Sequence, residues 1–222
     1  MYNKNENKLF KYIRWLNMIY NYILEKFEYG EPIFFSELPG KSKDYLRQQI
    51  KKLVDNGNLE RLYNGVYYLP YTTILGTKGR ISIDKYIEKK YIQTNQETKG
   101  YIKGLQLANQ YGFTTQNPSC YEICSNEATT GYRRQEVDGN TLIIYRPVKE
   151  VNEENRASLQ FLDLMSEIDK YCEISDDEKI RKIKKFVDIN NVDFKMVKEY
   201  LPFYPDKVYR NIYEGGVMSE LV

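Results

Sequence analysis

The stretch from residue 42 to residue 57 constrains the fold most, because it carries signals for both ends of one helix. Ser42 is a typical N-cap, whose hydroxyl accepts a backbone N–H, and Gly57 is a typical left-handed C-terminal stop. Between them the apolar residues recur at i, i+4, i+7 and i+8, and these are Leu46, Ile50, Leu53 and Val54. Residues at this spacing share one helical face. We therefore predict an amphipathic helix whose apolar face is turned toward a core.

The opposite face of this helix is basic. The residues on the stripe or beside it are Lys41, Ser42, Lys43, Arg47, Gln48 and Lys51. Side chains of these types contact phosphates and base edges when a helix enters a major groove. A basic face is also a common form of solvated surface, so the stripe alone leaves DNA binding and simple solvation both open.

After the helix, the pattern changes to short β-prone runs at 59–62 and 66–69. They are joined through Asn64-Gly65, which favours a tight hairpin turn, so we predict a two-stranded wing with Arg61, Tyr63 and Asn64 near its tip. Helices are predicted ahead of it at about 15–27 and 34–38. Three helices followed by a hairpin is the order of a winged helix-turn-helix, and we predict this DNA-binding fold for residues 1–75.

The distribution of charged residues along the chain also favours a DNA-binding role for the N-terminal region. Residues 1–80 carry 13 Lys and Arg against 8 Asp and Glu, whereas residues 151–222 carry 11 against 15. The basic end is the end that holds the predicted winged helix, and this favours a polyanionic partner there.

Residues 76–222 are predicted to form a small mixed α+β domain with a helical C-terminal tail. The expected helices lie at 83–92, 101–111, 154–171, 176–188, 194–200 and beyond Pro205, and the β-prone runs at 121–124, 132–137 and 141–146. The strands follow one another without intervening helices, which indicates α+β rather than a parallel α/β sheet. No apolar run approaches about 18 residues and no signal peptide is evident, so we expect a cytoplasmic protein without membrane contact.

Three cysteines and no histidine exclude Cys2His2 zinc sites and all catalytic apparatus that needs an imidazole. We expect the cysteines to be buried reduced thiols, and we expect no metal and no cofactor. Glu97, Lys99 and Glu122 supply the groups that a metal-dependent nuclease uses. Such triplets arise by chance in a chain that is 29% charged, and we predict that the protein is not an enzyme.

Two strings resemble a known family. FFSEL at 34–38, followed by LRQQIKKLVDNGNLERLYNGVYYLP at 46–70, resembles the N-terminal winged helix of the AbiEi antitoxins of type IV toxin–antitoxin systems. GYIKGLQLANQYGFTTQNP at 100–118, with ICSN at 123–126, resembles the second domain of their DUF6088 relatives. The similarity covers roughly residues 15–150.

The resemblance implies a transcriptional autorepressor that binds double-stranded operator DNA and counteracts a nucleotidyltransferase toxin. It places DNA reading on the recognition helix and the wing, at Lys43, Arg47, Gln48, Lys51, Arg61 and Asn64. Binding to repeated operators also allows a homodimer on the DNA. The alternative is a protein-binding module that neutralises the toxin by direct contact, and residues 100–118 serve either packing or partner contact.

Overall fold

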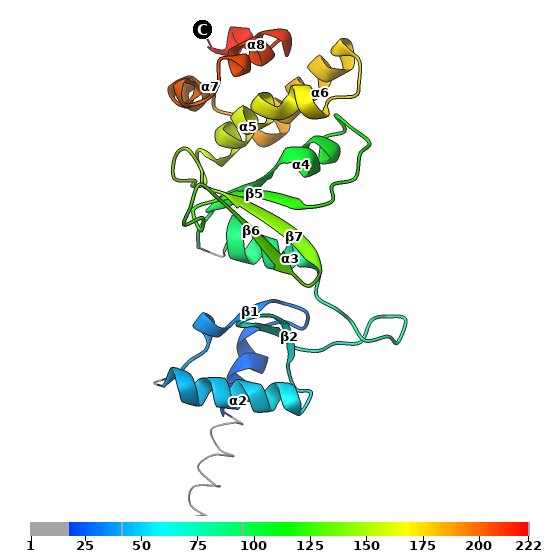
Figure 1. Ribbon diagram of the computed structural model, residues 1–222, viewed down its shortest axis with the longest axis vertical. Coiled ribbons are helices and arrows are strands. Elements are labelled where there is room, and N and C mark those ends of the chain that lie inside the picture. Colours follow the sequence, from blue (N-terminus) through cyan, green and yellow to red (C-terminus); the bar gives the residue numbers. More distant parts are fainter. Residues whose placement is uncertain (1–17, 41, 95, 222) are drawn as a thin grey trace, which may run out of the picture. The chain divides into compact units, whose positions relative to one another are not determined.

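The computed structural model of the protein describes residues 18–40, 42–94 and 96–221 (Figure 1). The chain forms two compact units, which divide between Tyr86 and Ile87. One contains a three-stranded sheet and the other a four-stranded sheet, each accompanied by helices, so the predicted α+β class is confirmed. The division falls later than the predicted boundary after residue 75, and residues 76–86 therefore belong to the first unit.

Unit 1 contains the predicted capped helix beside a small antiparallel sheet. Its elements are a helix over residues 18–26, β1 (Ile33–Phe34), the 3-10 helix η1 (Phe35–Glu37), α2 (Lys43–Asp55), β2 (Glu60–Tyr63) and β3 (Val66–Tyr68). The strand order is β1-β3-β2. Both predicted ends of α2 are confirmed, because the Ser42 hydroxyl accepts the Tyr45 N–H at 3.4 Å and Gly57 has a φ of 74°.

The core of unit 1 lies between the helix over residues 18–26, the apolar face of α2 and the sheet. Its fully buried members include Ile19, Ile23, Ile50 and Leu69. The hairpin turn at Asn64-Gly65 is confirmed in position, although only Gly65 takes a positive φ, of 74°. The β2–β3 register shifts between Arg61 and Tyr63, which is a bulge next to the turn.

Unit 2 is built on a mixed sheet with helices packed against it. The helical run α3 (Ile83–Ile87) crosses the division and continues as the π-helical η2 (Glu88–Ile92). The strands are β4 (Gly100–Lys103), β5 (Tyr121–Ser125), β6 (Tyr132–Val137) and β7 (Asn140–Tyr145), in the order β4-β5-β7-β6. Only β5 and β7 pair in parallel. The β6–β7 turn is Asp138-Gly139, as predicted, and both residues take positive φ.

Helices complete unit 2. They are α4 (Gly104–Gln110), α5 (Arg156–Tyr171), α6 (Asp176–Asn190), α7 (Phe194–Tyr200), η3 (Leu201–Phe203), α8 (Lys207–Glu214) and η4 (Met218–Leu221). α4 and α5 pack against β4, and α7 and α8 pack against α5 (Figure 1). The predicted helical tail is confirmed by the run of helices from α5 to α8. Within the described part of the chain, every helix is too short or too polar to cross a membrane.

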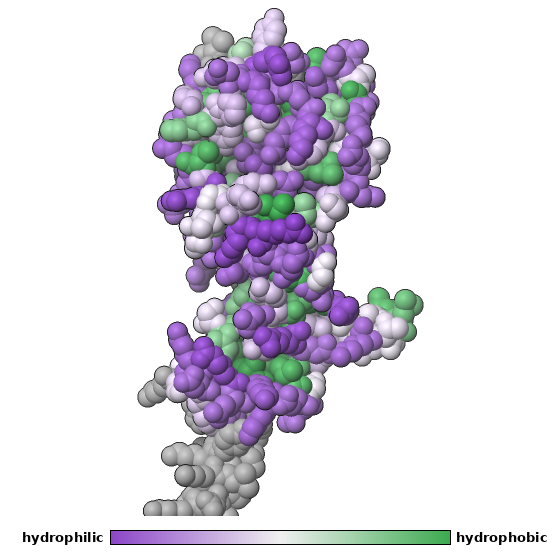
Figure 2. All heavy atoms as spheres, in the orientation of Figure 1, coloured by the Kyte–Doolittle hydropathy of each residue, from purple (hydrophilic) through white to green (hydrophobic). Residues whose placement is uncertain are grey.

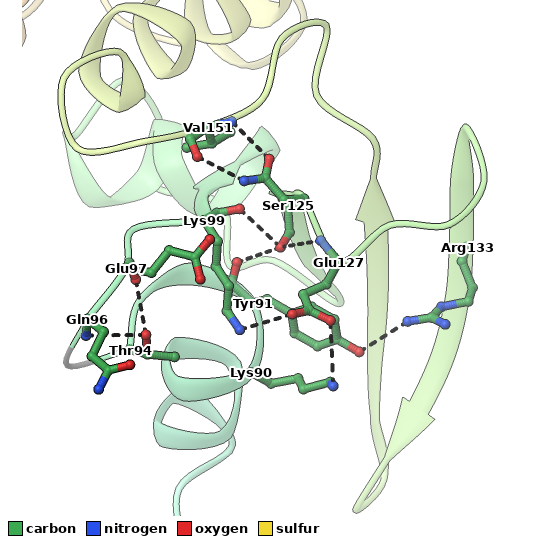
Figure 3. Close-up of polar contacts among 11 residues, drawn as sticks. Lys90, Tyr91, Thr94, Gln96, Glu97, Lys99, Ser125, Glu127, Arg133 and Val151 are labelled. Carbon is green, nitrogen blue, oxygen red and sulfur yellow. Dashed lines mark hydrogen bonds and ion pairs between the residues drawn. The ribbon is translucent and has the colours of Figure 1, made fainter. Parts of the chain in front are cut away.

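The predicted helix over residues 101–111 is wrong in its first three residues, 101–103. Residues 100–103 form strand β4, and α4 begins only at Gly104, where φ is 67°. Close backbone packing explains the strand, because a Cβ at Gly100 would lie 2.2 Å from the Tyr91 carbonyl oxygen and 2.5 Å from that of Cys124. The Ser125 hydroxyl donates to the same Tyr91 oxygen at 2.6 Å (Figure 3). Pairing with β5 therefore overrides the local helical pattern.

Candidate functional site

The outer face of α2 carries cations that are free of partners. Its inner face is buried, with Leu46 at 3% and Ile50 at 0% exposure. Lys43, Gln48 and Lys51 are exposed, and none of them pairs with another of the described residues. Ser42 is engaged as the N-cap. The predicted site residue Lys41 lies outside the described residues.

Arg47 is oriented by two neighbours. Its Nη1 donates to the Asp44 Oδ1 at 2.8 Å, and its Cζ lies 5.7 Å from the centroid of the Phe35 ring. Both charged side chains of the pair are exposed, Arg47 at 64% and Asp44 at 87%, so the ion pair contributes little to stability. The guanidinium is held in place but stays open to a ligand.

Phe35 connects α2 to the wing. Its N–H donates to the Gly65 carbonyl at 2.8 Å, and a Cβ at Gly65 would lie 3.9 Å from the Phe35 Cβ. The turn of the wing and the Arg47 guanidinium therefore both lie beside Phe35. The sequence analysis missed this positioning residue, although it belongs to the FFSEL string that preceded the helix.

The tip of the wing is arranged by its own hydrogen bonds. Arg61 donates from Nη2 to the Asn64 Oδ1 at 2.8 Å and from Nε to the Tyr63 carbonyl at 3.3 Å. Tyr63 itself is half-buried, with its ring 6.5 Å from that of Tyr86. Of the three predicted wing residues, Arg61 and Asn64 are exposed, whereas Tyr63 is partly committed to packing.

A second group of ionisable side chains lies inside unit 2, where sequence reasoning placed none. The Lys103 Nζ lies 3.3 Å from the Asp163 Oδ2, 3.4 Å from the Glu167 Oε1 and 4.8 Å from the centroid of the Tyr145 ring. The Tyr101 hydroxyl donates to the same Asp163 oxygen at 2.9 Å. The lysine comes from β4 and both carboxylates come from α5, one helical turn apart.

Burial and charge act against each other in this cluster. Burial lowers the pKa of Lys103, but the carboxylates of Asp163 and Glu167 raise it by more, so the net pKa lies above the usual range. Burial, together with the nearby Asp163 and Glu122, raises the pKa of Glu167, although Lys103 opposes the shift. Lys103 is therefore charged at neutral pH and compensated inside the fold, where a lone charge would be very costly.

Cys124 offers no activated thiol. Cys124 is buried, and burial together with the nearby Asp163 raises its pKa to about 12. Cys120 and Cys172 are half-buried rather than buried, and all three thiols are free. The predicted reduced thiols are confirmed, although the predicted burial holds only for Cys124. A thiol that stays protonated at neutral pH is a poor nucleophile.

The residues of the nuclease alternative do not meet. Lys99 is bound to Glu127 at 3.1 Å, and Glu97 is exposed in the turn before it (Figure 3). Glu122 lies opposite Lys103 in the β4–β5 register and accepts from the Tyr145 hydroxyl at 3.1 Å. Over the described ranges, no three His, Cys, Asp or Glu side chains are grouped so that they could hold a metal ion.

Comparison with known proteins gave no assignment, because neither the protein-family models nor the curated proteins contain a match to this chain.

Proposed function

We propose that unit 1 is a winged helix that binds double-stranded DNA, and that the protein is a transcriptional repressor acting through it. The observation that carries this proposal is the exposed face of α2 beside the wing, where Lys43 and Lys51 have no partner among the described residues. Cations that the fold does not neutralise are available to phosphates. The buried Lys103 provides the contrast, because its charge is already matched inside unit 2.

The topology of unit 1 supports the same proposal. A helix over residues 18–26, the short η1 and the longer α2 are followed by the β2–β3 hairpin, and β1 completes the sheet. In a helix-turn-helix the recognition helix lies in the major groove, and the elements around it contact the backbone. α2 takes the place of the recognition helix and the β2–β3 turn that of the wing.

The residues of the interface divide by chemistry. Lys43 and Lys51 are point charges suited to phosphates, which set affinity without reading sequence. Gln48 is the exposed amide on the same helix, and amides pair with the major-groove edge of adenine. Arg47, oriented by Phe35 and Asp44, suits either a guanine edge or a phosphate.

Fluorescence anisotropy tests this function. The full chain is titrated into a labelled duplex from upstream of its own gene and into a scrambled duplex of equal length and composition. We expect tighter binding to the upstream duplex, and a Kd about tenfold higher for Arg47→Ala on that duplex. Equal, weak binding to both duplexes would mean that the basic face is only solvated surface.

We further propose that the protein acts as an antitoxin toward a nucleotidyltransferase toxin, which the string at residues 100–118 supports by resemblance alone. The polar residues that end this string are used internally, since Thr114 and Gln116 both donate to Glu173. Co-expression of the neighbouring toxin gene with the full chain tests the role. Growth rescue with co-purification favours direct neutralisation, whereas rescue without a complex favours an indirect route.

A further inference from the structure

Residues 71–80 of unit 1, here called the arm, form a hydrogen-bonded hairpin. Thr72 and Lys78 form an antiparallel bridge, and the Thr73 N–H donates to the Thr77 carbonyl at 2.8 Å. The Gly76 N–H donates to the Thr73 carbonyl at 2.9 Å, and Gly76 has a φ of 76°. This closes a turn whose two central residues are Ile74 and Leu75.

The base of the arm is fixed by Tyr71. A Cβ at Gly79 would lie 2.2 Å from the Tyr71 ring, and one at Gly30 would lie 2.8 Å from it, so the ring occupies space that only glycines leave. The Tyr71 hydroxyl donates to the Arg80 carbonyl at 2.7 Å. In the returning segment of the arm, the Lys78 Nζ binds the Glu60 Oε1 at 2.7 Å. These contacts fix the direction in which the arm leaves the sheet.

The tip of the arm presents two large aliphatic side chains to solvent. Ile74 is 106% exposed and Leu75 is 89% exposed, and Figure 2 shows this apolar tip in green at the far end of the arm. Turn centres usually carry Gly, Pro, Asn, Asp or Ser. Residues 72–77 carry no charge, and the flanking Lys78 is already bound to Glu60. The chemistry of the tip suits an apolar protein surface rather than a phosphate backbone.

A hollow of about 520 Å³ lies at the opposite end of the same arm. Its lining residues are Tyr29, Pro70, Tyr71, Thr72 and Lys78. Tyr29 is 61% exposed, which leaves an aromatic wall open to a ligand. Unit 1 therefore carries an apolar tip and an aromatic hollow, separated by the length of one arm.

We propose that the arm mediates dimerisation, with the Ile74–Leu75 tip of each copy seated in the hollow of the other. Because tip and hollow lie at the two ends of one arm, two arms packed antiparallel around a two-fold axis fill both hollows at once. Such an isologous contact closes on itself and stops at two copies. The tip of a stiff hairpin cannot fold back onto its own base, so the contact forms only between chains.

The contact is small, which places it among weak, concentration-dependent dimers. It uses no residue of the α2 face and needs no DNA. Dimerisation is a property distinct from DNA binding, and it would bring the α2 helices of two chains into one complex. Its test is made without DNA, so a failure of dimerisation is distinguishable from a failure of DNA binding.

Sedimentation velocity of the full chain over a wide range of concentrations tests the dimer. We expect the mass to rise from the 26.5 kDa monomer toward twice that value. The double variant Ile74→Ser with Leu75→Ser should weaken association by at least about tenfold, since it removes both apolar groups from each contact. The matched control is Ile189→Ser, which removes a 58% exposed aliphatic side chain from α6 and should associate like the parent.

Disulfide trapping tests the pairing of tip with hollow. The variant that combines Tyr29→Cys with Leu75→Cys should give a covalent dimer under mild oxidation, in higher yield than either single variant. A ladder of higher oligomers would overturn the two-fold arrangement. A parent chain that stays monomeric, or a tip variant that dimerises like the parent, would overturn the proposal, as would a tip variant that loses only DNA affinity.

Discussion

Lys51 in unit 1 and Lys103 in unit 2 show two opposite uses of the same side chain. Lys51 is exposed on α2, with no partner among the described residues. Lys103 is 9% exposed and lies between two carboxylates and an aromatic ring. The charge of Lys103 is consumed by the fold, whereas that of Lys51 is available to a partner. The net charge of the chain therefore indicates less about function than whether each charge is neutralised within the fold.

The difference follows from where each lysine lies. A buried ammonium requires compensating partners because its desolvation is expensive, and α5 supplies Asp163 and Glu167 one helical turn apart. Lys51 lies on the solvent side of an amphipathic helix, where water compensates the charge at no cost to the fold. Substitutions at the two positions should consequently separate stability from binding.

The largest effect is expected from Lys103→Met. This substitution leaves the buried Asp163 and the half-buried Glu167 without their cation, and the free energy of unfolding should fall by about 3–5 kcal/mol. Lys51→Met removes no internal contact and should change the free energy of unfolding by less than about 0.5 kcal/mol. Urea unfolding of both variants measures the contrast. Equal losses would mean that the two lysines do not differ as described.

A buried polar group in unit 1 gives the next largest effect. Gln49 is fully buried, and neither its Oε1 nor its Nε2 has a hydrogen-bond partner among the described residues. Gln49→Met keeps the length and removes the unsatisfied amide, so the free energy of unfolding should rise by about 1–3 kcal/mol. The control is Gln48→Met at the exposed neighbouring position, which should leave stability nearly unchanged. A loss of stability in Gln49→Met would show that the amide is satisfied in solution.

Phe35→Leu should weaken DNA binding moderately. The substitution keeps an apolar side chain but removes the ring near the Arg47 guanidinium, an interaction of about 0.5–1 kcal/mol. The Kd should therefore rise about two- to fivefold in anisotropy titrations. Phe34→Leu is the control, because the centroid of that ring lies 6.1 Å from the centroid of the Tyr86 ring. Equal loss in both variants would assign the effect to general packing.

The smallest effects concern pH, and they have opposite signs in the two units. Burial raises the pKa of Glu60, but hydrogen bonds from Lys78 and Tyr68 lower it by more, so the net pKa lies below 4.5. The contribution of Glu60 to stability is therefore lost as the pH falls through that value. Glu167 has a net pKa above 4.5, so its contribution is present at low pH and lost as the pH rises through its folded pKa.

Chemical unfolding between pH 3 and pH 8 checks both directions. Glu60→Gln should flatten the loss of stability on the acid side, and Glu167→Gln should flatten the decline above pH 4.5. The account of the Lys103 cluster would be contradicted if Glu167→Gln steepened that decline.

The sequence predicted those parts of the fold that short-range signals decide. Ser42 and Gly57 mark both ends of α2, and Asp138-Gly139 fixes the β6–β7 turn, because each signal lies within a few residues of the structure it determines. The local pattern of residues 101–103 predicts helix, whereas their pairing with β5 depends on residues 122–124, outside that local pattern.

The candidate site shows the same limit. The exposed face of α2 follows from helical spacing, so Lys43, Arg47 and Lys51 could be named in advance. The position of Phe35 between Arg47 and the wing depends on the β1–β3 pairing. The Lys103 cluster joins β4 to α5, and its lysine and Asp163 are 60 positions apart in the sequence, so no local pattern predicts their pairing.

The salt dependence of DNA binding tests the central claim most directly. The Kd for the upstream duplex is measured at several salt concentrations for the parent chain, for Lys51→Ala and for Lys185→Ala, which removes an exposed lysine from α6 in unit 2. If Lys51 contacts a phosphate, the slope of log K against log salt should fall in magnitude by about 1 in Lys51→Ala and stay unchanged in Lys185→Ala. Identical slopes for all three proteins would contradict the claim that the α2 face binds DNA.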